Sequence, residues 1–382
     1  MIRVRLASPL TLLISVVGIG SLGCSAATPA PEQSRQEEQS RKPESALQKL
    51  SRAEAPALTA IKPPANPKVS HHFISERNLA ALPVPQQSPE LAKALADLQT
   101  GSVDARVAKL KAKVYADMVY VQGGRFMRGD FAKLMGIDGV TRMTYNSDDK
   151  VVKEVTLSDF WISKYKVTYA EFDVFADATK RQRAGMESEG GSFSFRHPLI
   201  PAHNTWKEAK AYCQWLGSIT DLPVDLPTEA QWEYAARSRG QFFMIPTDDG
   251  TIDFGRNLPF PAQESLLSSK LGGHRLIDSY PVGLFPPNPL GLFDMSENGL
   301  EWVDDWYAKD AYSKTQSQDP RGPETGTRKV VRSWGGDSLK IGVSVWRRSE
   351  DLTPTTKDEG SGKAIPAETP FLPGLRCAVS PR

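Results

Sequence analysis

The alternation of apolar and polar residues predicts three amphipathic helices in the middle of the chain, each beginning with the same capping pattern. In this pattern a threonine is followed, three residues later, by a glutamate or glutamine. The pairs are Thr168 with Glu171, Thr205 with Glu208, and Thr228 with Gln231. The apolar residues behind the caps are Phe172, Phe175 and Ala176; Ala209, Tyr212, Cys213 and Leu216; and Trp232, Ala235 and Ala236. Gly217 and Gly240 predict where the second and third helices end.

A shorter helical pattern precedes this region. Ser88 and Pro89 are typical of a helix start, with serine as the N-cap and proline at the first helical position. The apolar residues recur at helical spacing on both sides of a break at residues 100–101, and they are Leu91, Leu95, Leu98, Val107, Leu110 and Val114. We predict a helical neck over residues 88–117, either docked on the following domain or extending from it.

Residues 118–382 show strand patterns first and loops later. "MVYVQGGRFMRGD", from Met118, predicts a hairpin that turns at Gly123 and Gly124. "KEVTLSDFWISKYKVT", from Lys153, predicts a second strand pair. From Thr251 onward glycine, proline and asparagine are frequent, and no strong helical pattern is present. Loop-rich sequence of this kind in a compact domain is typical of functional surfaces, or of folds fixed by metals or disulfides.

The N-terminus has the layout of a secretory signal. Arg3 and Arg5 precede an apolar run that is too short to span a bilayer comfortably. Residues 21–24, "SLGC", resemble the lipobox of bacterial lipoproteins, which implies a signal peptide over residues 1–23 and an acylated (palmitate-bearing) Cys24. The alternative is ordinary signal cleavage that leaves Cys24 free.

The lipobox resemblance also implies a location. Ser25 stands where lipoproteins of the inner membrane usually carry aspartate, so we expect a bacterial outer-membrane anchor with the body in the periplasm. Residues 24–87 are rich in proline, glutamine, serine and charge, and they cannot bury enough apolar surface to fold, which predicts a disordered tether. His71 and His72 in this tether are expected to be solvated.

Composition and length limit the size of the folded domain but do not point to a binding partner. A net charge of +2 on 382 residues gives no argument for nucleic acid or acidic lipid. Forty per cent apolar residues and eight tryptophans suffice for a sizeable core. The length after the tether suits one domain of roughly 260 to 270 residues.

Several blocks then occur in the order of one family. They are "MVYVQGGRFMRGD", "FWISKYKVTYAEF", "NTWKEAKAYCQWLG", "LPTEAQWEYAARS", "YPVGLFPPNPLGLFDMSENGLEWVDDWY" and "PGLRCAV". From about Met118 to Val379 the chain resembles the formylglycine-generating enzyme, or sulfatase-modifying factor, family. The resemblance implies an elaborated C-type-lectin-like α+β domain, with little regular secondary structure, over residues 118–382.

The same resemblance raises the question of activity. Copper-using members bind Cu(I) through two cysteines near the C-terminus and, with O2, oxidise a sulfatase cysteine to formylglycine. Cu(I) is soft and needs thiolates, but the matching segment, residues 328–352, contains no cysteine, and the nearest one is Cys377. We therefore expect no copper and no formylglycine generation by this route.

A second branch of the family uses iron held by three histidines. His197, His203 and His274 are scattered here, and no His-x-x-x-Glu-x-His spacing exists. Each is expected to be a surface or hydrogen-bonding histidine. An oxidase with a divergent metal site remains the alternative function.

Two cysteines other than Cys24 remain, and an exported protein favours pairing Cys213 with Cys377. Family members often carry a disulfide between these two motifs. The alternative is two buried free thiols.

The acidic segment "DMSENGLEWVDDWY" matches a structural calcium site of the family. The resemblance places the ion at Asn298 and Glu301, with the carbonyl of Gly299, and a second calcium site near Asn257. Carboxylate, amide and carbonyl oxygens are the ligands that Ca²⁺ prefers. The alternative is a solvated acidic loop.

The leading functional hypothesis is a non-enzymatic binding or scaffold lipoprotein. Lipoproteins of the gliding and type IX secretion machinery, and accessory proteins of type VI secretion, use this fold without the catalytic pair. We expect a protein or cell-wall partner on the loop-rich face of residues 251–375. The candidate contacts are Trp334, Trp346, Arg347 and Arg348, and the alternative is core tryptophans beside a solvated arginine pair.

Overall fold

The computed structural model describes residues 46–52, 69–70, 85–136, 141–185, 196–272, 279–333, 342–352, 355–357, 364–366 and 372–381. All of them belong to the second of two compact units, which spans Lys42–Arg382. The predicted signal peptide, Cys24, His71 and His72 lie outside the described residues. Within the described part, no helix has both the length and the apolar character needed to cross a bilayer.

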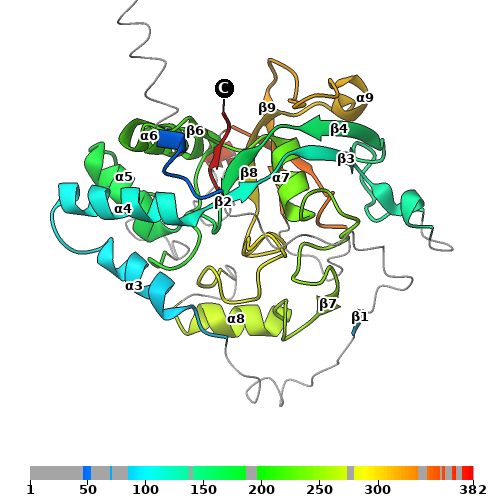
Figure 1. The fold of residues 1–382 in the computed structure, drawn as a ribbon. Coiled ribbons are helices and arrows are strands. Elements are labelled where there is room, and N and C mark those ends of the chain that lie inside the picture. Colours follow the sequence, from blue (N-terminus) through cyan, green and yellow to red (C-terminus); the bar gives the residue numbers. More distant parts are fainter. Residues whose placement is uncertain are drawn as a thin grey trace, which may run out of the picture. The chain divides into compact units, whose positions relative to one another are not determined.

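A four-stranded antiparallel sheet organises the unit (Figure 1). Its order is β2 (Met118–Val121), β5 (Phe160–Ser163), β13 (Ala378–Val379) and β6 (Val224–Asp225). The strand nearest the C-terminus, β13, therefore pairs with β5 on one side and β6 on the other. Trp161, Ile162 and Val379 are fully buried, so the centre of the sheet lies in the core.

The two predicted hairpins are wrong, although all four strands exist. β2 pairs with β5, while β3 (Gly124–Arg128) pairs with β4 (Lys153–Leu157). The same antiparallel register continues from one pair to the other, so residues 118–128 form one bent ribbon with residues 153–163. Gly123 lies at the bend, where a Cβ would come within 2.2 Å of the Leu157 carbonyl oxygen. The Gly123-Gly124 pair therefore permits a close crossing of two strands instead of a tight turn.

The three predicted capping boxes are confirmed. They begin α5 (Tyr169–Ala178), α6 (Trp206–Thr220) and α7 (Glu229–Ala236). Gly217 does not end α6, which continues for three more residues to a left-handed cap at Asp221. A Cβ at Gly217 would lie 2.9 Å from the Leu222 carbonyl oxygen, so this glycine allows the chain leaving the helix to pass close to it. Gly240 has a positive φ four residues beyond the end of α7.

The predicted neck is docked on the unit. It forms α3 (Pro89–Asp97) and α4 (Val103–Asp117), and both helices contact α5. Leu95 and Leu110 are fully buried in the same apolar cluster as α5 and α6. Lys113 adds an ion pair, its Nζ lying 2.8 Å from Glu171 Oε1 in the first turn of α5.

The C-terminal half contains shorter elements. They are β7 (Ile252–Asp253), α8 (Pro261–Ser269), β8 (Glu301–Trp306), α9 (Ala311–Lys314), β9 (Arg328–Arg332), β10 (Arg348–Asp351), β11 (Thr355–Lys357) and β12 (Ala364–Pro366). The strands β10, β9 and β8 form an antiparallel sheet, and β11 pairs with β12. Two further pieces are β1 (Val69–Ser70), parallel to β7, and the 3-10 helix η1 (Phe131–Met135). Helix α8 was not predicted, because its N-cap, Phe260, lacks the polar side chain that marks a helix start. The mixed content is that of the expected α+β domain.

The disulfide is present. Cys213 on α6 is bonded to Cys377, one residue before β13, with a Cα–Cα distance of 5.6 Å. Both residues are fully buried. The bond connects the helix layer to the middle of the four-stranded sheet.

Candidate functional site

Helix α7, which lies within the segment "PTEAQWEYAARS", has charged side chains that are buried in the interior. Glu229 and Glu233 lie one turn apart on the same face, and they are 1 % and 0 % exposed. Every residue of this short helix is buried, so no solvated face is available for its charged side chains. A buried carboxylate is strongly unfavourable unless it is paired and hydrogen-bonded.

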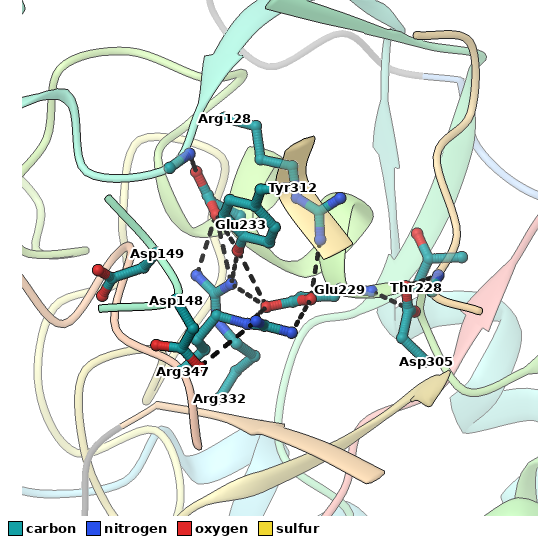
Figure 2. Close-up of polar contacts among 12 residues, drawn as sticks. Arg128, Asp148, Asp149, Thr228, Glu229, Glu233, Asp305, Tyr312, Arg332 and Arg347 are labelled. Atoms are coloured by element: carbon teal, nitrogen blue, oxygen red, sulfur yellow. Dashed lines mark hydrogen bonds and ion pairs between the residues drawn. The ribbon is translucent and has the colours of Figure 1, made fainter. Parts of the chain in front are cut away.

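Three arginines from distant parts of the chain surround Glu229, as Figure 2 shows. Arg347 donates from Nε to Oε1 at 2.6 Å and from NH2 to Oε2 at 3.1 Å. Arg128, on β3, donates to Oε2 at 2.8 Å, and Arg332, on β9, donates to Oε1 at 3.0 Å. This carboxylate therefore holds together residues from the bent ribbon, the β8–β10 sheet and the segment before β10.

Glu233 is satisfied by the same network. Its Oε1 accepts from the Arg237 guanidinium at 2.8 Å and from the Gly129 amide at 2.9 Å. Arg332 reaches its Oε2 at 3.3 Å. Tyr312, on α9, donates to Glu229 Oε1 at 2.9 Å, and the Arg128 guanidinium lies 4.1 Å above its ring. Both glutamates are therefore acceptors in a continuous buried ion cluster.

These partners determine the pKa of Glu229 and the charge balance of the cluster. Burial alone would raise the pKa of Glu229, but the charges of Arg347, Arg128 and Arg332 lower it to about 2. Glu229 is thus ionised at any physiological pH. The four arginines outnumber the two glutamates, and the carboxylates of Asp148, Asp149 and Asp305 lie near enough to interact with them (Figure 2).

Asp305, on β8, links the cluster to the start of α7. Its Oδ2 accepts from the Glu229 amide at 2.7 Å and its Oδ1 from the Gly322 amide at 2.6 Å. Burial, followed by the negative charge of Glu229, raises the pKa of Asp305 to about 6. Asp305 therefore satisfies a free amide of the helix N-terminus in addition to the Thr228 cap.

This cluster includes part of the segment in which the resemblance implies the metal-binding cysteines of copper-using enzymes. Arg332 and Arg347 both belong to residues 328–352, the segment that carries the copper-binding cysteines in copper-using enzymes of the kind this chain resembles. Here that segment supplies guanidinium groups to the glutamates of α7. Arginine cannot serve as a soft metal ligand, and a carboxylate with a pKa near 2 that is paired with three arginines is a poor base. The arrangement is suited to fixing the position of four chain segments.

Asp149 supplies a pH-dependent element beside the cluster. It is fully buried, accepts from Thr144 through Oδ2, and has no partner for Oδ1 among the described residues. Burial raises its pKa to about 7; Thr144 lowers the pKa, and the charges of Asp148 and Asp130 raise it further. The folded state therefore binds this proton more tightly than the unfolded state does. The stability that the proton contributes is complete below pH 3.8 and is lost as pH rises through about 7.

We expect Asp149→Asn to be more stable than the wild type at pH 8 and close to it at pH 4. Asparagine keeps the acceptor for Thr144 and removes the charge. The gain at pH 8 should be at most roughly 4 kcal/mol, which is the free energy of the pKa shift, and this shift already includes the attraction to Arg332. Urea unfolding of both proteins from pH 4 to pH 8 measures this difference. A gain that does not change with pH would contradict the titration of Asp149.

Where the structure describes them, the predicted partner-binding residues do not share one exposed surface. Arg347 is 1 % exposed and pairs with Glu229, so the expectation of an exposed Arg347 is wrong. Arg348 is exposed and pairs with Glu350, because successive residues entering β10 face opposite sides. Trp346 is half-buried, and Trp334 lies outside the described residues.

The residues of the predicted calcium sites have other contacts. The Asn298 amide is bonded to the backbone of Tyr280, through both Nδ2 and Oδ1. Glu301 accepts from Lys166 and Arg376, each at 2.7 Å, and the Gly299 carbonyl also accepts from Lys166. Since Asn298 points to backbone groups and Glu301 is already paired with two cations, these contacts do not fit a calcium ion.

The histidines have contacts typical of hydrogen-bonding residues. His203 is buried, with Nδ1 2.7 Å from the Leu372 carbonyl oxygen and Nε2 3.1 Å from Ser279 Oγ. Burial lowers its pKa to about 4, so it is neutral at physiological pH. His197 is partly exposed, and His274 lies outside the described residues. The described part of the chain contains no group of three or more His, Cys, Asp or Glu side chains arranged to hold a metal.

A cavity of about 960 Å³ lies beside β8 and α9, and the sequence did not predict it. Its walls include Trp306, Tyr307, Asp304, Lys314 and Lys329. The Lys329 ammonium lies between two indole rings, 3.9 Å from the centroid of Trp206 and 3.8 Å from that of Trp306, and donates to the Asp304 carbonyl at 2.7 Å. Burial lowers the pKa of Lys329 to about 8. Aromatic and charged residues therefore both line this cavity.

The fold and the motifs agree with one family. Residues 104–380 match the family described as "Sulfatase-modifying factor enzyme 1-like domain". The chain belongs to this family. The match begins within α4, so the sulfatase-modifying-factor domain includes part of the helical neck.

The relatives of this chain differ in length and in the activity that their names state. The chain is 28 % identical over 311 residues to a formylglycine-generating enzyme of Thermomonospora curvata, covering 69 % of this chain and 93 % of that enzyme. It is 28 % identical over 247 residues to the serine/threonine-protein kinase pkn1 of Chlamydia caviae, covering 59 % of this chain but only 34 % of the kinase. The chain thus spans about a third of the length of that relative.

Two further similarities bear on function. The chain is 28 % identical over 241 residues to a Bos taurus protein named "Inactive C-alpha-formylglycine-generating enzyme 2", covering 50 % of this chain and 71 % of that protein. Among solved structures, PvdO from Pseudomonas aeruginosa is similar with a TM-score of 0.50 and 25 % identity, covering 69 % of this chain and 94 % of PvdO. The sulfatase-modifying-factor fold therefore occurs in proteins named as active and in one named as inactive.

Proposed function

We propose that this sulfatase-modifying-factor domain is a binding or scaffold module of the bacterial cell envelope, anchored through an acylated Cys24, and not a formylglycine-generating oxidase. One observation carries the proposal. Residues 328–352 contain no cysteine, and they contribute Arg332 and Arg347 to a buried ion cluster with Glu229. The remaining two cysteines, Cys213 and Cys377, are bonded to each other and offer no thiolate.

The cavity of about 960 Å³ is the binding site that we favour. It lies within the loop-rich residues 251–375, and its wall presents Trp306 and Tyr307 beside charged groups of both signs. Aromatic side chains are preferred anchors of protein interfaces. A protein or cell-wall component with both polar and apolar groups would be complementary to this wall. We therefore propose this cavity as the binding site in place of a surface around Arg347, which is buried.

The absence of oxidase activity is testable directly. We expect the purified full chain, supplied with Cu(I) and O2, to leave a peptide carrying a sulfatase-type cysteine unchanged by mass spectrometry. The Thermomonospora curvata enzyme under identical conditions is the positive control. Conversion of the cysteine to an aldehyde by this chain, or stoichiometric copper or iron with O2 consumption, would overturn the proposal.

The binding role needs a separate test with a matched control. Lys314, at the cavity, and Lys93, on α3, are each 75 % exposed and each pair with an aspartate one helical turn away. We expect a photo-crosslinking residue at position 314 to give a specific adduct in intact cells, while the same residue at position 93 gives none. Equal labelling from both positions would argue against a binding site at the cavity.

A further inference from the structure

A buried lysine lies where the resemblance to calcium-binding relatives places a metal. Lys166, between β5 and α5, is fully buried. Its Nζ donates to the Gly299 carbonyl at 2.8 Å and to Glu301 Oε1 at 2.7 Å. These two oxygens are among the ligands that were predicted for calcium. Because an ammonium group carries three donors and a positive charge, it can satisfy oxygens that would otherwise bind a hard cation.

The remaining acceptor sites of Glu301 are also used. Arg376 donates to Glu301 Oε2 from Nε at 2.7 Å and to Oε1 from NH2 at 2.8 Å. The Trp232 indole donates to Oε2 at 2.9 Å. The carboxylate of Glu301 is therefore paired with two cationic side chains, Lys166 and Arg376.

At the second position implied by the resemblance a cation also pairs with acidic groups, but at the surface, where Arg256 is 42 % exposed. The Asn257 amide donates to Asp248 Oδ1 at 3.1 Å and to the Thr251 carbonyl at 3.1 Å, so it faces acceptors and not a cation. The neighbouring Arg256 donates to three carboxylates, which belong to Asp248, Asp249 and Asp253, at 2.5 to 2.7 Å. A positive side chain again pairs with the acidic groups of the loop.

We propose that this chain has replaced the structural calcium ions of its relatives with its own cations, Lys166 at the Gly299–Glu301 loop and Arg256 at the Asn257 loop. The fold then does not depend on the surrounding calcium concentration. It also follows that the Gly299–Glu301 loop retains a latent metal site: removing the ammonium while leaving space would free the Gly299 carbonyl oxygen and one of the two hydrogen bonds to Glu301 Oε1, which Arg376 still contacts, close to a second carboxylate at Asp294. This inference is independent of the proposed binding function.

The wild-type protein provides the first test. We expect the full chain, after treatment with a chelator and desalting, to contain no stoichiometric calcium and to melt at the same temperature with EDTA or with millimolar CaCl2. Calcium that remains bound stoichiometrically, or a Tm that EDTA lowers, would overturn the proposal without any variant.

Variants at position 166 provide the second test. We expect Lys166→Ala to be less stable than the wild type, and we expect CaCl2 to raise its Tm in a saturable way by about 5 °C. Lys166→Met, which fills the same space with an apolar chain, should be destabilised without responding to calcium. If Lys166→Ala does not fold alone, its refolding from urea with and without CaCl2 gives the same comparison. Equal responses of the two variants would contradict the latent site.

Discussion

Glu229→Gln is expected to lower the free energy of unfolding by about 3 to 5 kcal/mol at pH 7. Glutamine keeps the shape of the side chain and removes its charge. Arg128, Arg332 and Arg347, all buried, would then lose their shared carboxylate, and each would face an amide that both donates and accepts. Removing one partner of a buried ion network leaves uncompensated charge in the interior, which is why the effect is large.

A matched control separates this effect from the loss of a helix N-terminal charge. Glu90 stands in the first turn of α3, as Glu229 does in α7, but Glu90 is exposed. We expect Glu90→Gln to change stability by about 1 kcal/mol or less. Urea unfolding of the two variants measures the difference. If they were destabilised equally, the arginine cluster would contribute nothing beyond the helix dipole.

The pH dependence gives the prediction a second signature. The pKa of Glu229 is lowered in the folded state from 4.5 to about 2, so its ionised form contributes stability above pH 4.5 that is lost as pH falls through 2. The wild type and Glu229→Gln should therefore converge in stability at the acidic end of this range. A constant difference down to pH 2 would mean that glutamine disturbs packing instead of charge.

The features that the sequence predicted correctly depend on short-range patterns. A capping box lies within four consecutive residues, and all three predicted boxes formed because a threonine and a nearby glutamate or glutamine satisfy each other locally. The strands β2 to β5 were likewise located from their alternation. Their partners were not, because the choice between a hairpin and a bent ribbon depends on contacts between residues about 40 positions apart.

The ion cluster could not be predicted for the same reason. "LPTEAQWEYAARS" identifies the family, yet the partners of Glu229 come from positions 128, 332 and 347. A weaker signal was present: Glu229, Glu233 and Arg237 recur every four residues in a helix rich in alanine and aromatic residues. Charges on a helix that lacks a polar face imply buried partners. That signal predicts that partners exist but does not say which residues they are.

Lys166 illustrates another limit of local patterns. The resemblance implied a calcium ion at Asn298 and Glu301 from a short motif and its oxygen ligands. The cation found there comes from a lysine more than 130 positions earlier in the chain. Local ligand spacing shows where negative charge gathers, while only the tertiary structure shows which positive charge balances it.

The disulfide gives the other large effect. Reducing Cys213–Cys377 should destabilise the folded unit by up to about 5 kcal/mol, since the bond closes a loop with a sequence separation of 164 residues and restricts the unfolded chain. For a domain of this size the loss corresponds to a fall in Tm of roughly 10 °C. Thermal unfolding of the full chain with and without a phosphine reductant measures it, with mass spectrometry to confirm that the bond is reduced.

Substitution of both cysteines provides the control for this comparison. Reduction removes the cross-link and pushes two buried sulfur atoms apart, whereas substitution by alanine removes both the cross-link and the sulfur atoms. The double variant Cys213→Ala, Cys377→Ala should therefore melt at or below the reduced wild type, and its Tm should not respond to the reductant. If the fully reduced wild type kept the Tm of the oxidised protein, the bond would contribute nothing to stability, and the pairing of β13 with β5 and β6 would be enough to hold this strand in place.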